Sequence, residues 1–175
     1  NSNYIIELFG NAKTVRNVNS SRFGKFIKLY IDDEKTIIGS SIESYLLEKS
    51  RVSKINRLER SYHIFYLVCS NRSRLQKYNF KDMSNYTIFA QLDDVNILKE
   101  FENLDLLMDI LNQFNFSEKQ CDKIFGELKL ILELLNCANK SELDTTLSGM
   151  LDILHILGIG RIELTNQLTN KVFEV

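Results

Sequence analysis

Residues 17–25 read NVNSSRFGK, and the interpretation of the whole chain starts from this stretch. It combines two asparagines, two adjacent serines, an arginine, a glycine and a lysine, with no carboxylate among them. The segment is too polar for a protein core, and it carries more hydrogen-bond donors than an ordinary solvated turn. Lys13 and Arg16 precede it, so the window concentrates positive charge.

Such a loop is suited to phosphate, because fixed cations and backbone N–H groups neutralise charge without reorganising. Asn17, Ser20 and Ser21 have short side chains that let backbone N–H groups come close to a bound group. A serine hydroxyl can also coordinate Mg²⁺ beside a nucleotide by replacing one water. On composition alone, the alternative is a basic loop whose serines cap turns. The chain has no G-x-x-x-x-G-K-[ST] motif, so the main phosphate cradle is expected elsewhere.

The first third of the chain predicts a short helix and a β-hairpin. NYIIELFGNAKT (residues 3–14) starts with an apolar cluster, and Gly10 suits the C-cap of a short helix. KFIKLYID (25–32) and TIIGSSIESYLL (36–47) are rich in aromatic and β-branched residues, as strands are. The intervening DDEK is expected to form the turn that joins them.

RLERSYHIFYLVC (57–69) predicts a helix with a mostly apolar second half. His63 lies between aromatic residues in it and is interpreted as a packing histidine rather than a catalytic base. Glu59 and Arg60 are either an ion pair or part of a solvated face, and we favour an internal polar contact. Residues 70–85 have a weak pattern and are expected to be a surface connection.

The remaining residues are expected to be helical. Ser117 with Gln120 forms a capping-box pattern, and Gly158 is placed to end a later helix. Residues 161–175 are expected to hold one more short helix. We interpret three apolar stripes at helical spacing as core packing. They are Ile97, Phe101, Leu104, Met108 and Leu111; Cys121, Ile124, Leu128, Ile131 and Leu135; and Leu147, Leu151, Leu154 and Leu157 in a helix opened by Ser141.

Composition indicates a globular protein, since 44% of the 175 residues are hydrophobic and 26% are charged. Residues 1–77 hold 14 Lys and Arg against 7 Asp and Glu, whereas residues 78–175 hold 8 against 16. This asymmetry indicates different neighbours for the two halves. No apolar run reaches ~18 residues, so no membrane span is expected. The chain begins with Asn1 and is expected to be an excised piece of a larger protein.

The three cysteines are scattered and form no C-x-x-C motif, and only two histidines could join them in a metal site. We therefore expect reduced, buried thiols at Cys69, Cys121 and Cys137 rather than a zinc site. With no signal-peptide pattern at the start, the expected compartment is the cytosol.

NVNSSRFGK resembles switch I of the myosin motor domain, whose pattern is N-x-N-S-S-R-F-G-K. ELFGNAKT is similar to the myosin stretch EAFGNAKT, SYLLEKSRV matches the family closely, and ERSYHIFY resembles ER-[SN]-[FY]-H-I-F-Y. The four blocks follow the family's order and spacing and span about residues 7–66, over a third of the chain. Kinesins share an N-x-x-S-S-R core but continue with Ser-His, where this chain has Phe23 and Gly24. That difference excludes them.

The resemblance implies an α+β fragment of the α/β motor domain of a P-loop NTPase. Its expected order is a short N-terminal helix, a β-hairpin and a mainly α-helical subdomain. Residues 1–50 would carry switch I and strands of the motor's central sheet. Residues 51–175 would be the helical upper 50-kilodalton subdomain, so that the chain forms one incomplete domain between the phosphate-binding loop and the second switch.

The resemblance also implies roles for five residues around Mg-ATP. Asn17 would hydrogen-bond the nucleotide phosphates, and Ser20 would lie against the γ-phosphate and the attacking water. Ser21 would coordinate Mg²⁺, and Lys25 would brace the loop at the cofactor site. Arg22 would pair with a glutamate of the second switch, which this chain does not contain. Ser20 and Arg22 are therefore the expected catalytic residues, acting by positioning and electrostatics.

The implied function is part of an ATP-hydrolysing, actin-based myosin motor in the cytoplasm and cytoskeleton. Actin filaments and the rest of the heavy chain would be its partners. The piece alone is expected to be inactive, because the phosphate-binding loop and the second switch lie outside it. From residue 70 onward the resemblance thins. The alternative is therefore a divergent, non-cycling helical module that retains the loop and binds a protein.

A nucleic-acid binder that uses the basic first half is the third hypothesis. It needs aromatic residues interleaved with Lys and Arg on one face. Phe26, Tyr30 and Phe65 are instead expected to lie in the core. No nucleic-acid partner is therefore expected.

Overall fold

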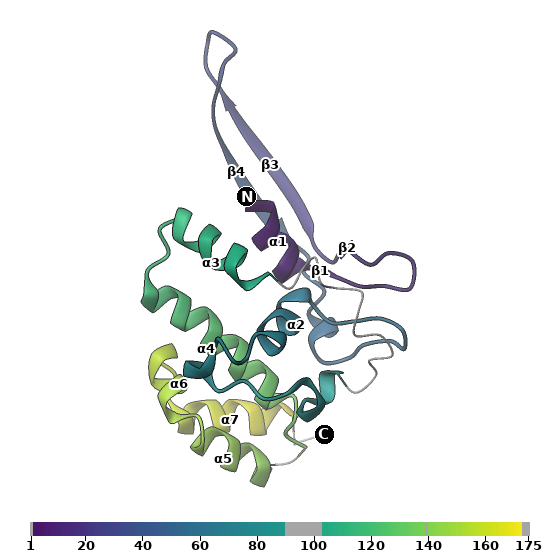
Figure 1. Ribbon diagram of the computed structural model, residues 1–175, viewed down its shortest axis with the longest axis vertical. Coiled ribbons are helices and arrows are strands. Elements are labelled where there is room, and N and C mark those ends of the chain that lie inside the picture. The colour runs from purple at the N-terminus through teal and green to yellow at the C-terminus, as the bar shows by residue number, and fades with distance from the viewer. Residues whose placement is uncertain (1, 90–102, 139, 173–175) are drawn as a thin grey trace.

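The protein consists of a helical body from which a long β-hairpin projects (Figure 1). The computed structural model describes residues 2–89, 103–138 and 140–172. Within these ranges the chain forms helices and two small antiparallel sheets, the mixture expected of an α+β fragment. No helix in the described residues is long and apolar enough to cross a membrane. The short elements are β1 (Asn11–Ala12), β2 (Ser20–Ser21) and the 3-10 turns η1 (Lys49–Val52), η2 (Gln76–Tyr78), η3 (Met83–Asn85) and η4 (Thr87–Phe89).

The projecting hairpin is made of β3 (Gly24–Ile31) and β4 (Ile37–Tyr45), which confirms the two predicted strands. Asp32 tightens the connection between them, because its Oδ1 accepts a hydrogen bond from the Thr36 amide at 2.8 Å. Lys35 has a φ of 63° and supplies the left-handed conformation that reverses the chain.

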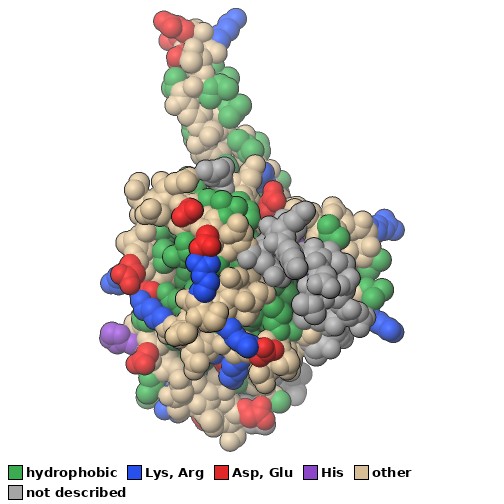
Figure 2. All heavy atoms as spheres, in the orientation of Figure 1, with side chains coloured by type: hydrophobic (Ala, Val, Ile, Leu, Met, Phe, Trp, Pro, Cys, Tyr) green, Lys and Arg blue, Asp and Glu red, His purple; other side chains and the backbone are tan. Residues whose placement is uncertain are grey.

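Both faces of this hairpin are open to solvent, and hydrophobic side chains line it (Figure 2). The exposed apolar residues of the two strands are Phe26, Ile27, Leu29, Tyr30, Ile31, Ile37, Ile38, Ile42 and Tyr45. The expectation that Phe26 and Tyr30 lie in the core is wrong for this chain. They are 52% and 49% exposed, because no second layer covers the ribbon within the described residues. Apolar residues on both faces are typical of strands that are covered on both sides.

α1 (Ser2–Gly10) lies at the base of the hairpin and ends at the predicted glycine, but for another reason. Gly10 does not adopt the left-handed conformation of a glycine C-cap. Instead, the ring of Phe23 packs against it, and a Cβ on Gly10 would lie 2.4 Å from Phe23 Cε1. The missing side chain therefore lets the loop before the hairpin close onto the end of α1.

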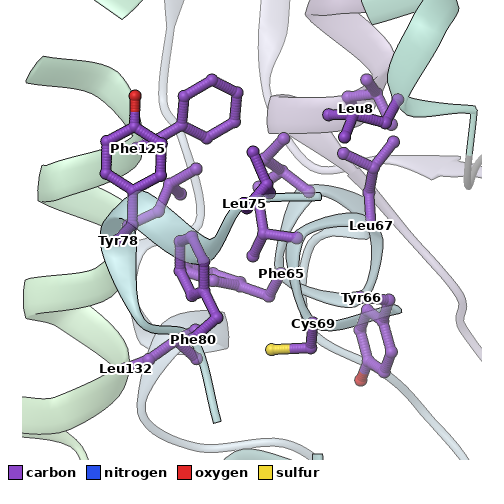
Figure 3. Packing of buried hydrophobic residues seen from close by; sticks show 14 of the residues in the cluster. Leu8, Phe65, Tyr66, Leu67, Cys69, Leu75, Tyr78, Phe80, Phe125 and Leu132 are labelled. Carbon is purple, nitrogen blue, oxygen red and sulfur yellow. The ribbon is translucent and has the colours of Figure 1, made fainter. Parts of the chain in front are cut away.

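α2 (His63–Ser70) lies at the centre of the body and is buried along almost its whole length (Figure 3). The predicted helix over 57–69 is wrong in its first half. Tyr62 forms a β-bridge with Ala12, and the Arg60 amide donates to the carbonyl of the residue after Ala12 at 3.0 Å. These backbone bonds hold the segment extended against the first strand, so the helix begins only after them.

Residues 70–85 run mostly over the surface, as predicted, but three of their side chains enter the core, so the predicted surface connection is wrong in part. Leu75, Tyr78 and Phe80 are buried among polar neighbours. The ring centroid of Tyr78 lies 5.2 Å from that of Phe125 (Figure 3). The buried residues follow neither a helical nor a strand period, so their spacing gives no pattern to detect.

α3 (Leu104–Gln113) packs against α1 and matches part of the first predicted stripe. Met108 is an exception, since it is 38% exposed while Leu107 is fully buried. Ile97 and Phe101 of the same stripe lie outside the described residues.

α4 (Glu118–Leu134) runs through the body (Figure 1). Its predicted capping box is confirmed, because the side chains of Ser117 and Gln120 each bond to the other residue's backbone amide. Leu132 faces the main core, whereas Leu130 faces a second cluster. α4 therefore separates and supports two hydrophobic cores.

The second cluster is closed by three helices. They are α5 (Lys140–Ser148), α6 (Leu151–Leu157) and α7 (Arg161–Val172). The single helix predicted after Ser141 is divided in two at Gly149, a residue that weakens helix interiors because it loses the most backbone entropy. Gly158 ends α6 with a φ of 67°, which confirms the predicted glycine cap.

The main core also contains an ion pair. Lys129 and Glu133 on α4 are 5% and 7% exposed, with Nζ and Oε1 2.5 Å apart. Lys81 Nζ lies 2.6 Å from Glu133 Oε2, and the Tyr86 hydroxyl donates to Oε1 at 3.3 Å. Burial alone would raise the pKa of Glu133, but hydrogen bonds from the two lysines outweigh it and lower the pKa.

We predict that Glu133→Gln lowers the free energy of unfolding by about 3 kcal/mol, because it leaves the buried Lys129 charge without its counter-ion. Glu127→Gln on the exposed face of the same helix is the control and should change it by less than about 0.5 kcal/mol. Urea unfolding of the two variants measures both values. Equal effects would contradict the role given to the buried pair.

Candidate functional site

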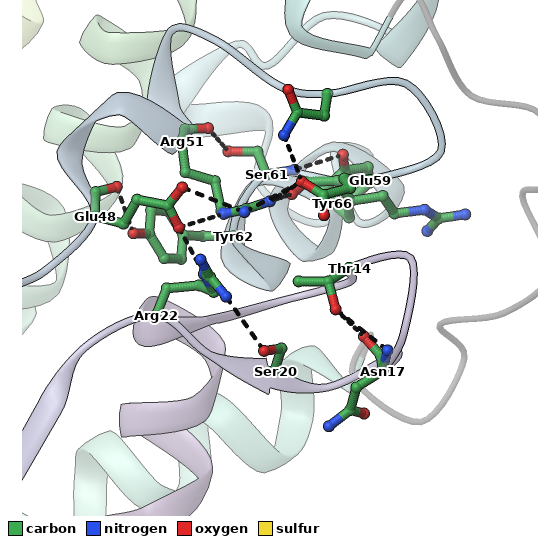
Figure 4. Close-up of polar contacts among 12 residues, drawn as sticks. Thr14, Asn17, Ser20, Arg22, Glu48, Arg51, Glu59, Ser61, Tyr62 and Tyr66 are labelled. Carbon is green, nitrogen blue, oxygen red and sulfur yellow. Dashed lines mark hydrogen bonds and ion pairs between the residues drawn. The ribbon is translucent and has the colours of Figure 1, made fainter.

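The polar stretch of the sequence forms a loop at the foot of the hairpin. β1 and β2 pair antiparallel, with Asn11 opposite Ser21, and residues 13–19 connect them. The turn is closed by Thr14, whose amide donates to the Asn17 carbonyl at 2.8 Å (Figure 4). We call residues 13–23 the NSSR loop.

Asn19 holds the NSSR loop in place, and sequence reasoning missed it. Its Oδ1 accepts a hydrogen bond from Asn11 Nδ2 at 2.9 Å and lies 3.1 Å from His63 Nε2. Its Nδ2 donates to Glu7 Oε2 at 3.2 Å. One amide therefore ties the loop to α1, β1 and α2. Asn19 belongs to the NVNSSRFGK stretch, but nothing near it in the sequence indicates its contact with His63, which lies 44 positions away.

Asn17 is exposed at the tip of the loop. Its Oδ1 accepts a hydrogen bond from the Asn19 amide at 2.9 Å, which orients the side chain. Among the described residues no partner is found for its Nδ2 group, so that amide is available as a donor. An oriented, exposed amide donor is suited to a phosphate oxygen.

The two serines present their hydroxyl groups differently. Ser21 is exposed and donates its hydroxyl hydrogen to the Phe23 carbonyl at 3.1 Å. This contact leaves the lone pairs of its oxygen for a cation, so the residue fits a magnesium ligand. Ser20 is half-buried and accepts a hydrogen bond from Arg22 Nη1 at 3.4 Å. No cluster of three or more His, Cys, Asp or Glu side chains able to hold a metal occurs in the described ranges.

Lys25 lies at the start of β3 and points to α1 rather than to the loop tip. Its Nζ is 3.5 Å from Asn3 Oδ1. The contact braces the hairpin against α1. The other four predicted site residues lie within the NSSR loop, where Arg22 contacts Ser20, Asn17 contacts Thr14 and Asn19, and Ser21 contacts Phe23.

Arg22 is bound to a carboxylate of this chain. Its Nε donates to Glu48 Oε2 at 2.5 Å, and the same oxygen accepts a hydrogen bond from Arg51 Nε at 2.8 Å (Figure 4). Burial alone would raise the pKa of Glu48, but hydrogen bonds from Arg51 and Arg22 outweigh it and lower the pKa. Glu48 is therefore an anion between two guanidinium groups.

Glu59 extends this network. It lies 3.3 Å from Arg51 Nη2, and Arg51 is only 4% exposed. The favoured internal polar contact is confirmed for Glu59, but its partner is Arg51 rather than Arg60. Arg60 lies over the Tyr66 ring at 5.1 Å from its centroid.

The sequence predicts that His63 and the three cysteines are buried, and their exposed fractions test this. His63 is 1% exposed and packs in the core, as predicted. Cys69 and Cys121 are buried free thiols, and burial raises the pKa of Cys69 to about 12. Cys137, which follows the end of α4, is a free thiol but only half-buried, so the expectation of a buried thiol is wrong there.

All 175 residues match the family model of the myosin head (motor domain). The chain belongs to the myosin motor domain family. It is 37% identical over 154 residues to Myosin-6 of Arabidopsis thaliana, an alignment that covers 83% of this chain and 10% of that protein. It is 44% identical over 147 residues to Myosin-1 of Saccharomyces cerevisiae, covering 77% and 7%. With Myosin-52 of Schizosaccharomyces pombe, identity is 33% over 180 residues, covering 97% and 12%. The chain spans about a tenth of the length of these relatives.

We predict that His63 makes this myosin motor segment less stable in mild acid. Burial, and then the nearby charge of Arg60, lowers the pKa of His63 from 6.5 to about 4. Between pH 6.5 and pH 4, His63 is protonated in the unfolded chain but stays neutral in the folded chain. The stabilising contribution is therefore present above pH 6.5 and is lost as the pH falls toward 4.

Between pH 7 and pH 5 this group should remove about 2 kcal/mol from the free energy of unfolding. His63→Gln keeps a donor toward Asn19 and should abolish that part of the pH dependence. His155→Gln, at an exposed histidine, should retain it. Urea unfolding at both pH values measures the difference, and identical slopes for all three proteins would contradict the assignment.

Proposed function

We propose that this chain supplies switch I to the Mg-ATP site of an actin-based myosin motor. The observation that carries the proposal is the NSSR loop itself. It is held by the Asn19 amide, yet it leaves the Asn17 amide donor and the Ser21 oxygen open to solvent. In a member of the myosin motor domain family, such a loop is suited to contact nucleotide phosphates and their magnesium ion.

Each of the predicted site residues has a proposed role. Asn17 would donate to the phosphates, Ser20 would lie beside the γ-phosphate and the attacking water, and Ser21 would be a magnesium ligand. Arg22 would stabilise the closed site, and Lys25 would hold the hairpin against α1 behind it. Ser20 and Arg22 are the proposed catalytic residues. Bound ATP supplies the reactive phosphoanhydride, and the chain's contribution is orientation and charge.

The hairpin has a proposed place in the same motor. We assign residues 1–50 to switch I and to strands of the central sheet, and residues 51–175 to the helical upper 50-kilodalton subdomain. The support is the apolar surface on both faces of β3 and β4, which an additional layer on each side would bury.

The activity belongs to the complete motor. The chain lacks a Walker-type phosphate-binding motif, so its loop would have to meet a cradle supplied by another segment. We therefore propose that the isolated chain does not hydrolyse ATP. Actin filaments and the remainder of the heavy chain are the proposed partners.

The experiment that tests this function is the Mg-ATPase rate of the complete parent chain, with and without actin filaments. Turnover that actin accelerates is the expected result. A negligible rate with both additions, in a parent whose phosphate-binding loop is intact, would replace the proposal by a non-cycling binding module.

We predict that Arg22→Ala in the complete motor slows ATP hydrolysis by about two orders of magnitude or more while ATP binding stays nearly unchanged, because Arg22 acts on the closed site. Arg57→Ala, at an exposed arginine of this chain, is the matched control. Single-turnover hydrolysis and nucleotide-binding kinetics separate the two steps. Hydrolysis at the normal rate in the Arg22 variant would remove its catalytic role.

A further inference from the structure

Glu48 is joined to Arg22 both through its side chain and through the backbone. The Arg22 Nε to Glu48 Oε2 contact is 2.5 Å, and the Glu48 amide donates to the Arg22 carbonyl at 3.0 Å. The Tyr62 hydroxyl donates to the Glu48 carbonyl at 2.8 Å. These contacts fix the carboxylate relative to the NSSR loop, so it is not a flexible surface group.

Arg51 holds the other side of this carboxylate from inside the protein. Its Nη1 donates to the Arg60 carbonyl at 3.1 Å, and its own carbonyl accepts a hydrogen bond from Ser61 Oγ at 3.0 Å. Both Nη1 and Nη2 of Arg51 also donate to Glu59 Oε2. The Arg51 guanidinium is therefore held by Glu59 and Arg60, which lie just before α2. The network is therefore anchored at Arg51, which is 4% exposed, and reaches solvent at Arg22, which is 29% exposed.

The position of Glu48 leaves part of the Arg22 guanidinium available. Glu48 accepts a hydrogen bond from Nε, and Nη1 makes a long contact of 3.4 Å with Ser20 Oγ. Within the residues that the structure describes, no hydrogen-bond partner is found for Nη2. An arginine has five donors in a rigid fork, so the end with the two terminal nitrogens can still receive an anionic group.

We propose that Arg51 and Glu48 are positioning residues that hold Arg22 by its Nε edge and direct its terminal nitrogens toward the site. This role rests on the proposed function, because it acts through Arg22. It also connects the NSSR loop to the segment before α2, so the helical half of the chain helps to set the geometry of the loop.

An inhibitory role of Glu48 predicts the opposite effect on hydrolysis. If Glu48 only sequestered Arg22 away from the site, removing its charge would release the arginine and speed hydrolysis. If Glu48 positions Arg22, the same change loosens the arginine and slows hydrolysis. The sign of the effect therefore distinguishes the two.

The test uses the complete motor with Glu48→Gln, which keeps the shape and an acceptor but removes the charge. We expect hydrolysis to slow by about ten- to hundredfold, with ATP binding changed less than about twofold. Glu43→Gln is the matched control, since Glu43 lies on β4 in an exposed ion pair with Lys28 and should leave hydrolysis unchanged. Unchanged or faster hydrolysis in Glu48→Gln overturns the proposal.

Arg51→Lys tests the inner residue. A lysine keeps the charge but cannot hold two carboxylates with a planar fork, so hydrolysis should slow as in Glu48→Gln. Normal hydrolysis in a folded Arg51→Lys motor overturns the role of Arg51. Should this variant fail to fold, Glu48→Gln still decides whether Arg22 is positioned through Glu48.

A double-mutant cycle distinguishes positioning of Arg22 from a general structural role of Glu48. In the Arg22→Ala background, Glu48→Gln should have no further effect on hydrolysis, because its target is gone. Additive losses overturn the proposal. Failure of the proposed function is distinguishable, since the wild-type motor would then be inactive or Arg22→Ala would be silent.

Discussion

The side-chain amide of Asn19 is the contact on which the arrangement of the site depends. Its oxygen and nitrogen reach Asn11, His63 and Glu7, which belong to three different elements. Backbone hydrogen bonds and the Arg22–Glu48 ion pair hold the two ends of the NSSR loop, and the Asn19 amide is the side chain that joins its middle to all three elements. Because the amide is satisfied on both ends, the loop is ordered while its outer donors remain free for a ligand.

In two parts of the molecule, a buried cation fixes the position of a carboxylate. Arg51 fixes Glu48 and Glu59 beside the loop, and Lys129 fixes Glu133 near the C-terminal end of α4. In both places a buried cation holds a carboxylate in one geometry, which flexible surface pairs do not achieve. One network supports the candidate site, and the other joins the 70–89 segment to α4.

Local signals predicted the elements that local interactions stabilise. The hairpin, the capping box at Ser117 and the glycine cap at Gly158 depend on residues close in sequence. The first half of the helix expected over 57–69 was wrong, because Tyr62 pairs with a strand far earlier in the chain. The NVNSSRFGK block predicted which residues gather in the candidate loop. Asn19 and Glu48 lie in quoted blocks, but their contacts with His63 and Arg22 span 44 and 26 positions, so only folding reveals these roles.

The exposed hairpin makes the uncovered chain liable to associate with other chains. Neither β3 nor β4 has a further strand beside it in the described residues, so both edges present unpaired backbone groups next to apolar side chains. Such edges pair readily with any available strand. As long as no other segment covers it, this ribbon is prone to self-association and is a surface that a folding chaperone would shield.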